Sequence, residues 1–171
     1  MALTDQKMAG RATLHLMVGL PGSGKTTRAK EIEAETGAIR FTPDEWQLRL
    51  FGDETDDPMH DARHTEIEQI MWQLTEKLLQ RGVSVILDYG FWAEEERLHF
   101  CGQAARLGAD FAVHFMDAPL AELLRRIALR NQREEEPAFT ILPHHMEEWS
   151  AFFQPVTAAE REKYAAILNR G

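Results

Sequence analysis

The segment Gly19–Thr26, which reads Gly-Leu-Pro-Gly-Ser-Gly-Lys-Thr, constrains this chain more than any other feature. It matches the pattern G-x-x-x-x-G-K-[ST], a glycine-rich turn between a strand and a helix. The neighbouring residues fit that context: residues 12–18 are apolar enough for a buried strand, and a helix is expected over residues 25–35, ended by Gly37. The sequence therefore predicts a phosphate-binding loop over residues 19–26.

The residue types of this loop follow from the chemistry of binding phosphate. Glycines adopt backbone conformations that turn N–H groups toward phosphate oxygens, and the helix start adds the positive end of its dipole. Lys25 is expected to reach the β- and γ-phosphates and to act in catalysis, and the Thr26 hydroxyl is expected to bind Mg²⁺. The alternative, a glycine-rich turn with a chance Lys-Thr pair, is disfavoured because every fixed position is matched. The predicted nucleotide-binding residues of the loop are Gly19, Pro21, Gly22, Ser23, Gly24, Lys25, Thr26 and Thr27.

Strand patterns alternate with helix patterns along the 171 residues. Besides the strand at 12–18, strands are expected at residues 39–41, 83–87 and 110–116, and helices after Thr42 and at residues 60–80, 93–107, 119–132, 143–153 and 157–169. This alternation predicts one domain, residues 1–171, with three α/β/α layers around a mostly parallel sheet.

The charge and the cysteine content limit the possible partners. The chain has 28 acidic and 19 basic residues and a formal net charge of −9, so it has no overall attraction to nucleic acid or to an anionic membrane. Its single cysteine, Cys101, cannot form an intrachain disulfide, which fits a reducing compartment. No apolar run approaches the ~20 residues of a membrane-spanning helix, and residues 1–11 contain no apolar stretch of the signal-peptide type. We therefore expect a cytoplasmic protein without a membrane partner.

Two aspartates are expected at the carboxyl ends of strands, where ligands bind in parallel α/β sheets. The strand at 83–87 ends at Asp88, where a carboxylate can hold Mg²⁺ or its waters; the alternative is an aspartate that caps the next turn. Asp44 follows the strand at 39–41 and could take the proton of an attacking hydroxyl. The alternative for Asp44 is a carboxylate in a first helical turn, favoured by the helix dipole, and both interpretations can hold together.

Four arginines fall within nine residues of this otherwise acidic chain: Arg125, Arg126, Arg130 and Arg133. Arg126 and Arg130 are four residues apart and would share a helix face. Arginines that close over phosphates stabilise the charge of a transferred group, so a mobile lid is expected over residues of about 125–138, with Arg126 and Arg130 as nucleotide ligands. The alternative is a solvated helix face with surface ion pairs.

Aromatic residues near the predicted strand ends could line an acceptor pocket, or they could be ordinary core and rim residues. They are Phe41, Trp46, Tyr89, Phe91 and Trp92. Together with Asp44 and Asp88, we take Trp46 and Tyr89 as the candidate substrate residues.

Two histidines, His60 and His64, lie four residues apart, like two metal ligands on one helix face. No third ligand is evident, and Asp61 stands where the helix of a zinc protease has Glu. Metal binding by this pair is therefore disfavoured.

These motifs together resemble the small P-loop kinases that include phage polynucleotide 5′-hydroxyl kinase, chloramphenicol phosphotransferase and the zeta-toxin kinases, a group described as AAA-like ATP-binding kinases. The resemblance covers roughly residues 13–150. It rests on the segments Leu20–Thr27, Thr42–Trp46, Val85–Tyr89 and Asp117–Arg126, and on the pair Arg130-Asn131.

The resemblance implies a nucleoside-kinase-like P-loop NTPase fold with a helical lid, and an ATP-dependent phosphotransferase that uses Mg²⁺. It implies that Asp44 is the general base and that Asp88 belongs to the substrate and metal site. It also implies that Arg126 is a catalytic lid arginine that contacts the nucleotide, with Arg130 as a second candidate. The chain has no Asn-Lys-x-Asp guanine motif, which favours ATP over GTP.

One departure from the group bears on the acceptor. Its polynucleotide kinases usually place a basic pair after the second strand, whereas this chain has Pro43-Asp44-Glu45. We therefore expect transfer of the γ-phosphate of MgATP to a hydroxyl of a small-molecule acceptor. Two alternatives stay open: a polynucleotide 5′-hydroxyl kinase and a non-catalytic ATP-binding module. Simple hydrolysis is less favoured, because no residue that would orient water can be named and kinase lids exclude water.

Overall fold

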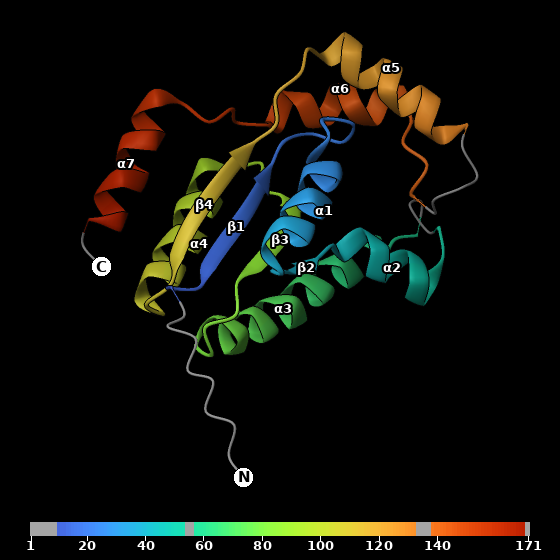
Figure 1. The fold of residues 1–171 in the computed structure, drawn as a ribbon. Helices are drawn as coiled ribbons and strands as arrows, with labels where there is room; N and C mark the ends of the chain where they lie inside the picture. The colour runs from blue at the N-terminus through green and yellow to red at the C-terminus, as the bar shows by residue number, and fades with distance from the viewer. Residues whose placement is uncertain (1–9, 54–56, 133–137, 170–171) are drawn as a thin grey trace.

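The computed structural model describes residues 10–53, 57–132 and 138–169, which form a parallel sheet flanked by helices (Figure 1). The strands are β1 (Thr13–Val18), β2 (Ile39–Phe41), β3 (Val85–Gly90) and β4 (Asp110–Phe115). The helices of the described residues are α1 (Lys25–Thr36), α2 (Pro43–Phe51), α3 (His60–Leu79), α4 (Glu94–Arg106), α5 (Leu120–Asn131), α6 (Pro143–Phe152) and α7 (Ala158–Leu168). None of these helices is both long and apolar enough to cross a membrane.

The sheet has the strand order β2-β3-β1-β4, and every pairing is parallel. Helices cover both of its faces, with α1 on one face and α3 and α4 on the other (Figure 1). The alternation along β1 explains this arrangement, since Leu14 and Leu16 join the core on the α3 and α4 side while Met17 packs with Ile32 of α1. The three-layer α/β/α fold expected from the sequence is therefore confirmed.

The carboxyl ends of the strands meet at one edge of the sheet, and α5 and α6 lie beyond that edge (Figure 1). The position of Asp88 at this edge differs from the expectation. β3 starts at Val85 and runs to Gly90, so Asp88 lies inside the strand and does not end it. The reason is the neighbouring strand: β1 pairs with β3 as far as Val18 opposite Gly90, which keeps the backbone extended past the carboxylate.

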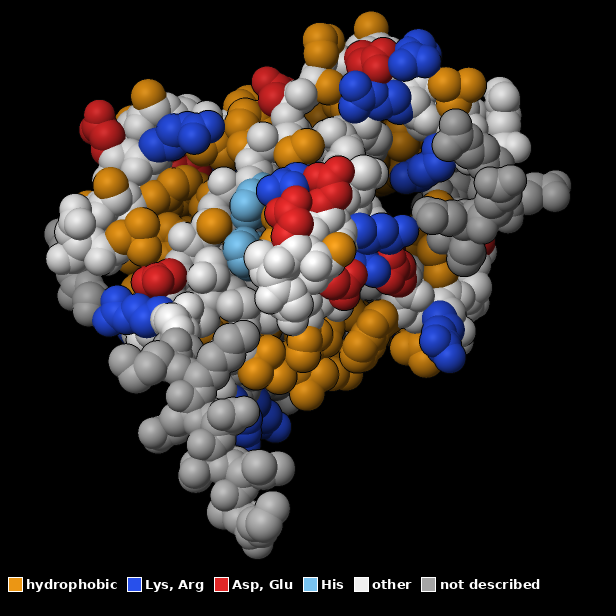
Figure 2. Space-filling model, viewed as in Figure 1, with side chains coloured by type: hydrophobic (Ala, Val, Ile, Leu, Met, Phe, Trp, Pro, Cys, Tyr) orange, Lys and Arg blue, Asp and Glu red, His pale blue; other side chains and the backbone are white. Residues whose placement is uncertain are grey.

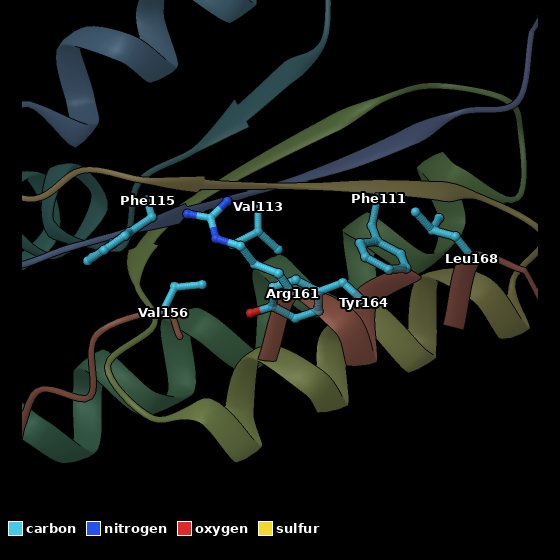
Figure 3. Close-up of a pocket in the computed structure, with 7 residues that line it drawn as sticks. All are labelled: Phe111, Val113, Phe115, Val156, Arg161, Tyr164 and Leu168. Carbon is cyan, nitrogen blue, oxygen red and sulfur yellow. The ribbon is translucent and has the colours of Figure 1, made fainter. Parts of the chain in front are cut away.

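The last helix, α7, lies beside β4 at the outer edge of the sheet (Figure 1). A small cavity of about 160 Å³ separates the two, and Figure 3 shows Phe111 and Val113 of β4 on one side of it with Tyr164 of α7 on the other. The firmest attachment of α7 is to α4, because the fully buried Arg97 forms an ion pair with the fully buried Glu160 at 2.6 Å. A buried pair of this kind fixes one element against another.

Candidate functional site

The loop between β1 and α1 has backbone conformations that favour glycine. Gly19, Gly22 and Gly24 have φ angles of 149°, 80° and 97°. A Cβ atom at Gly19 would lie 2.5 Å from the carbonyl oxygen of Met116, so only glycine lets the two backbones come this close. Gly24 is the N-cap of α1 and no side chain caps the helix, which leaves the first N–H groups of α1 for an anion. The loop thus has the geometry of a phosphate cradle.

Lys25, the first residue of α1, extends back along this loop. Its Nζ donates a hydrogen bond of 2.9 Å to the carbonyl oxygen of Leu20. Burial lowers the pKa of Lys25 to about 8, even though the carboxylates of Asp88 and Asp44 act in the opposite direction. The ammonium group of Lys25 is therefore still charged at neutral pH. Because little solvent reaches it, the charge is available to a phosphate.

The Asp88 carboxylate is held on one side and unpartnered on the other. Its Oδ2 accepts hydrogen bonds from the hydroxyls of Thr26, at 2.7 Å, and Thr42, at 3.3 Å. Its Oδ1 is buried and has no hydrogen-bond partner among the described residues. Burial raises the pKa of Asp88 above its usual range. An orphaned carboxylate oxygen beside a hydroxyl is a donor set that fits Mg²⁺, which prefers hard oxygen ligands.

Asp44 lies in the first turn of α2 and faces the same space. Its Oδ1 is 3.1 Å from Nε2 of His64 on α3, and 63% of its side chain is exposed. Desolvation by the surrounding protein would by itself raise the pKa of Asp44. The charges of His64, Lys25 and Arg130 outweigh this effect and lower the pKa below its usual range. Asp44 is thus an ionised, accessible proton acceptor. It also lies in the first turn of α2, so the two interpretations of Asp44 given above hold together.

The predicted arginine group separates in the structure. On α5, Nη1 of Arg126 donates to the carbonyl oxygen of Gly22 at 3.3 Å. Nη2 of Arg130 donates to the carbonyl oxygen of Phe139 at 3.0 Å. Both arginines line the cavity described below. Arg126 also forms an ion pair of 2.7 Å with Glu122, a carboxylate that it shares with the exposed Arg125. Arg133 and the adjoining part of the predicted lid, residues 133–137, lie outside the described residues.

A cavity of about 950 Å³ at the carboxyl edge of the sheet brings these groups together. Figure 2 shows it from one side as a hollow bordered by basic side chains. The predicted site residues that line it are Pro21, Gly22, Gly24, Lys25, Thr26, Thr27, Asp44, Asp88, Tyr89, Arg126 and Arg130. Positive charge from the loop and the arginines therefore shares one cavity with two carboxylates.

Three predicted residues are not among those that line the cavity. Gly19 and Ser23 belong to the phosphate loop but do not line the cavity. Trp46, a candidate substrate residue, is the third, and its ring packs edge-on against Phe41 with the ring centroids 6.1 Å apart. Of the other aromatic candidates, Phe91 and Trp92 join Tyr89 on the cavity wall.

Sequence reasoning did not assign α3, α4 and α6 to this site, yet these helices form a second wall of the cavity. Its residues are His60, Asp61, His64, Glu96, His145 and Trp149. The spacing of His145 and Trp149, four residues apart on α6, places both on one helix face and was an available signal. His60 and His64, the spacing of which suggested a metal pair, both contact α2: Gln47 Nε2 is 3.0 Å from Nδ1 of His60, and Asp44 Oδ1 is 3.1 Å from Nε2 of His64.

Comparisons with known proteins agree with this geometry. A family model described as an AAA domain matches residues 14–156. No curated protein matches the sequence. A chain in the structure of the Pnkp1/Rnl/Hen1 RNA repair complex aligns with a TM-score of 0.65 and 22% identity, over 97% of this chain and 48% of that chain.

A second solved structure, of a candidate kinase from Chloroflexus aurantiacus, aligns with a TM-score of 0.67 and 16% identity, over 88% of this chain and 82% of that chain. At these identities the likeness shows the fold alone. The chain also spans only about half the length of the repair-complex protein that it matches. With the loop geometry, the matches identify a P-loop NTPase fold.

Proposed function

Because the chain belongs to the family of AAA domains and has a P-loop kinase-like fold, we propose that it is an ATP-dependent kinase for a hydroxyl group of a small molecule. One observation carries the proposal: the ionised carboxylate of Asp44 faces the same cavity as Lys25 of the phosphate loop. A module that only binds ATP needs the loop but has no use for a proton acceptor. We further propose that residues 1–171 act as one kinase domain whose lid includes Arg126 and Arg130.

The phosphate side of the cavity would hold the nucleotide. The N–H groups at the start of α1 and the ammonium group of Lys25 bind the β- and γ-phosphates, and Arg126 and Arg130 bind them from α5. Thr26 and Asp88 are the proposed ligands of Mg²⁺, which would neutralise phosphate charge when bound. These groups position the γ-phosphate and stabilise the charge that spreads over it during transfer.

Asp44 is the proposed general base. As the acceptor oxygen forms its bond to the γ-phosphorus, the hydroxyl proton moves to the Asp44 carboxylate, and the bond from that phosphorus to the bridging oxygen breaks to release ADP. The carboxylate is ionised and 63% exposed to the cavity, so it is available to a hydroxyl placed beside it.

The charge around Asp44 supports a small acceptor over a polynucleotide. Besides Asp44 itself, the carboxylates of Glu45, Asp61 and Glu96 line the cavity. A polynucleotide would have to bring its own phosphates past these groups and past a net charge of −9. We therefore propose that Tyr89, Asp44 and Asp88 bind a small acceptor that is not a polyanion.

A polynucleotide 5′-hydroxyl kinase is the second candidate. It is favoured by the fold shared with a protein of an RNA repair complex over 97% of this chain. Binding of a 5′-hydroxyl oligonucleotide measured against salt concentration separates the two candidates, since phosphate contacts weaken steeply as salt rises. Tight, salt-sensitive binding would favour the polynucleotide.

The fate of labelled γ-phosphate tests the proposed activity. The protein is incubated with Mg²⁺, labelled ATP and two acceptor sets: 5′-hydroxyl oligonucleotides and a small-molecule extract. We expect label in a small compound, and no such label with the Lys25→Ala control. Label that stays in ATP despite tight ATP binding would contradict the kinase and favour the non-catalytic module.

A further inference from the structure

The candidate base has a partner that the nucleotide site does not explain. His64 of α3 lies between two carboxylates: its Nε2 is 3.1 Å from Oδ1 of Asp44 on α2, and its Nδ1 is 3.5 Å from Oε1 of Glu68, one helical turn further along α3. Because an ionised carboxylate only accepts hydrogen bonds, Nε2 must carry the proton that joins His64 to Asp44. The imidazole of His64 thus connects Asp44, the proposed base, to the carboxyl group of Glu68.

Packing between α2 and α3 fixes the position of this ring. His60, one turn before His64, is stacked with it at a centroid distance of 6.4 Å. His60 is in turn held by Gln47 of α2, a fully buried residue whose Nε2 lies 3.0 Å from the ring and donates to the His60 carbonyl oxygen. The two helices are therefore joined at successive turns, and His64 presents Nε2 to Asp44 from a fixed support.

Asp44 needs such a support because most of its side chain is exposed. An exposed aspartate samples several rotamers, and only some of them present an oxygen to a hydroxyl in the cavity. A hydrogen bond from Nε2 to Oδ1 selects one rotamer and leaves Oδ2 for the acceptor. Orientation of this kind is worth a large factor in rate when the reacting atoms must be aligned.

The charges around His64 favour its protonated form. Burial would lower the pKa of His64, but Asp44 and Glu68 outweigh that effect and raise it. The groups that act on this network come from all the surrounding elements: Asp44 of α2, Asp61 and Glu68 of α3, Glu96 of α4, Lys25 of α1 and Arg130 of α5. A protonated imidazole both donates to Asp44 and keeps that carboxylate ionised.

We propose that His64 is a positioning residue for phosphoryl transfer, which holds Asp44 in its reactive rotamer while Glu68 holds the opposite side of the imidazole. The proposal rests on Asp44 being the base of the proposed kinase. His64 touches neither the phosphates nor the acceptor in this role. Its effect reaches the reaction only through Asp44.

The first test measures the titration of the His64 ring by NMR and needs no acceptor. Its signal is assigned by its loss in His64→Gln. We expect the ring to titrate above the ordinary histidine pKa in the unaltered protein and at lower pH in Asp44→Asn and in Glu68→Gln. A titration that does not move in Asp44→Asn would overturn the link between the two residues.

The second test is kinetic and uses whichever acceptor takes up the label. His64→Leu should lower kcat about tenfold to a hundredfold with little change in KM for ATP, since only the alignment of the base is lost. The fall of kcat at acid pH should also move to higher pH, because Asp44 loses a neighbouring positive charge. His64→Gln keeps a donor at the Nε2 position and should recover part of kcat. A purely structural role for His64 would not move the pH profile.

Two controls separate failure of this inference from failure of the proposed kinase. His99→Gln, on α4 outside the cavity, should leave all readouts unchanged. Asp44→Asn is measured beside the His64 variants. If Asp44→Asn keeps full turnover, the base assignment fails. If Asp44→Asn loses turnover while His64→Leu keeps the unaltered kcat and pH profile, only the role of His64 fails.

Discussion

The Thr26 hydroxyl donates a hydrogen bond of 2.7 Å to Oδ2 of Asp88, although the two residues lie 62 positions apart in the chain. The bond joins the start of α1 to β3 across the carboxyl edge of the sheet. It also orients Asp88 so that the second carboxylate oxygen, Oδ1, is left without a described partner beside the phosphate loop. The two side chains proposed to share Mg²⁺ are thus already in contact.

Asp88→Asn should weaken the dependence of ATP binding on Mg²⁺. An amide is a poorer ligand for a hard cation than a carboxylate, so the affinity gained on adding Mg²⁺ should fall about tenfold to a hundredfold. Calorimetric titration with ATP, with and without a chelator, measures this difference. Asp110→Asn, at the start of β4 and away from the cavity, is the matched control. An unaltered Mg²⁺ effect in Asp88→Asn would remove Asp88 from the metal site.

Asp44→Asn should spare ATP binding and abolish most transfer. The amide keeps the size of the side chain but cannot take a proton, so kcat should fall about 10²–10⁴-fold. The measurement combines the Kd for ATP with the rate of label transfer to the acceptor. Turnover within twofold of the unaltered protein would show that Asp44 is not the base.

Gly19→Ala and Gly37→Ala should differ sharply although both glycines have positive φ. A Cβ at Gly19 would lie 2.5 Å from the Met116 carbonyl oxygen, whereas nothing lies within 4 Å of a Cβ at Gly37. We expect Gly37→Ala to cost about 1–2 kcal/mol of backbone strain and to keep ATP binding. Gly19→Ala should lose ATP binding and unfold at lower denaturant concentration. Equal losses in both variants would contradict the steric argument.

Glu160→Gln should destabilise the fold far more than a change in an exposed ion pair. It leaves the buried guanidinium of Arg97 without its counter-charge, which typically costs about 3–5 kcal/mol. Urea unfolding measures the loss, and Lys163→Met, which breaks an exposed contact with Glu94 on the same helix pair, provides the comparison. If both variants lose the same free energy of unfolding, the buried pair is not what attaches α7 to α4.

Glu68→Gln should change how stability depends on pH. Burial raises the pKa of Glu68 from 4.5 to about 7, so the folded protein binds this proton more tightly than the unfolded chain. Stability contributed by the protonated form is present below about pH 4.5 and is lost as pH rises through about 7. The variant should therefore melt higher than the unaltered protein at pH 8, by roughly 2–4 °C for each kcal/mol regained, and no higher at pH 4. Glu66→Gln, exposed on the same helix, should show no such difference.

The loop and most element bounds could be predicted because they depend on local signals. Gly37 ends α1 in the left-handed conformation, with φ of 72°, and the strand expected at 39–41 is β2. The helix expected at 60–80 is α3, which ends at Leu79. Each of these signals lies within a few residues of the feature that it marks.

Contacts between elements could not be predicted in the same way. The helix expected after Thr42 is α2, and Thr42 is its N-cap residue, but the Thr42 hydroxyl donates to Asp88 of β3 and makes no cap hydrogen bond. The direction of Trp46 depends on the rotation of α2, which its sequence does not determine. His64 was considered with His60 because the two lie four residues apart on one helix. Its hydrogen-bond partner, Asp44, lies twenty residues earlier in the chain and on another helix.

The buried pair of Arg97 and Glu160 links the last helix, α7, to the wall of the cavity. Arg97 also donates from Nη1 to the carbonyl oxygen of Phe91, a residue of the cavity wall with a positive φ of 46°. Glu160 lies 63 positions after Arg97, on α7, a helix that contributes no residue to the lining of the cavity. A change in α7 that disturbs Glu160 would therefore reach the cavity wall at Phe91 through Arg97.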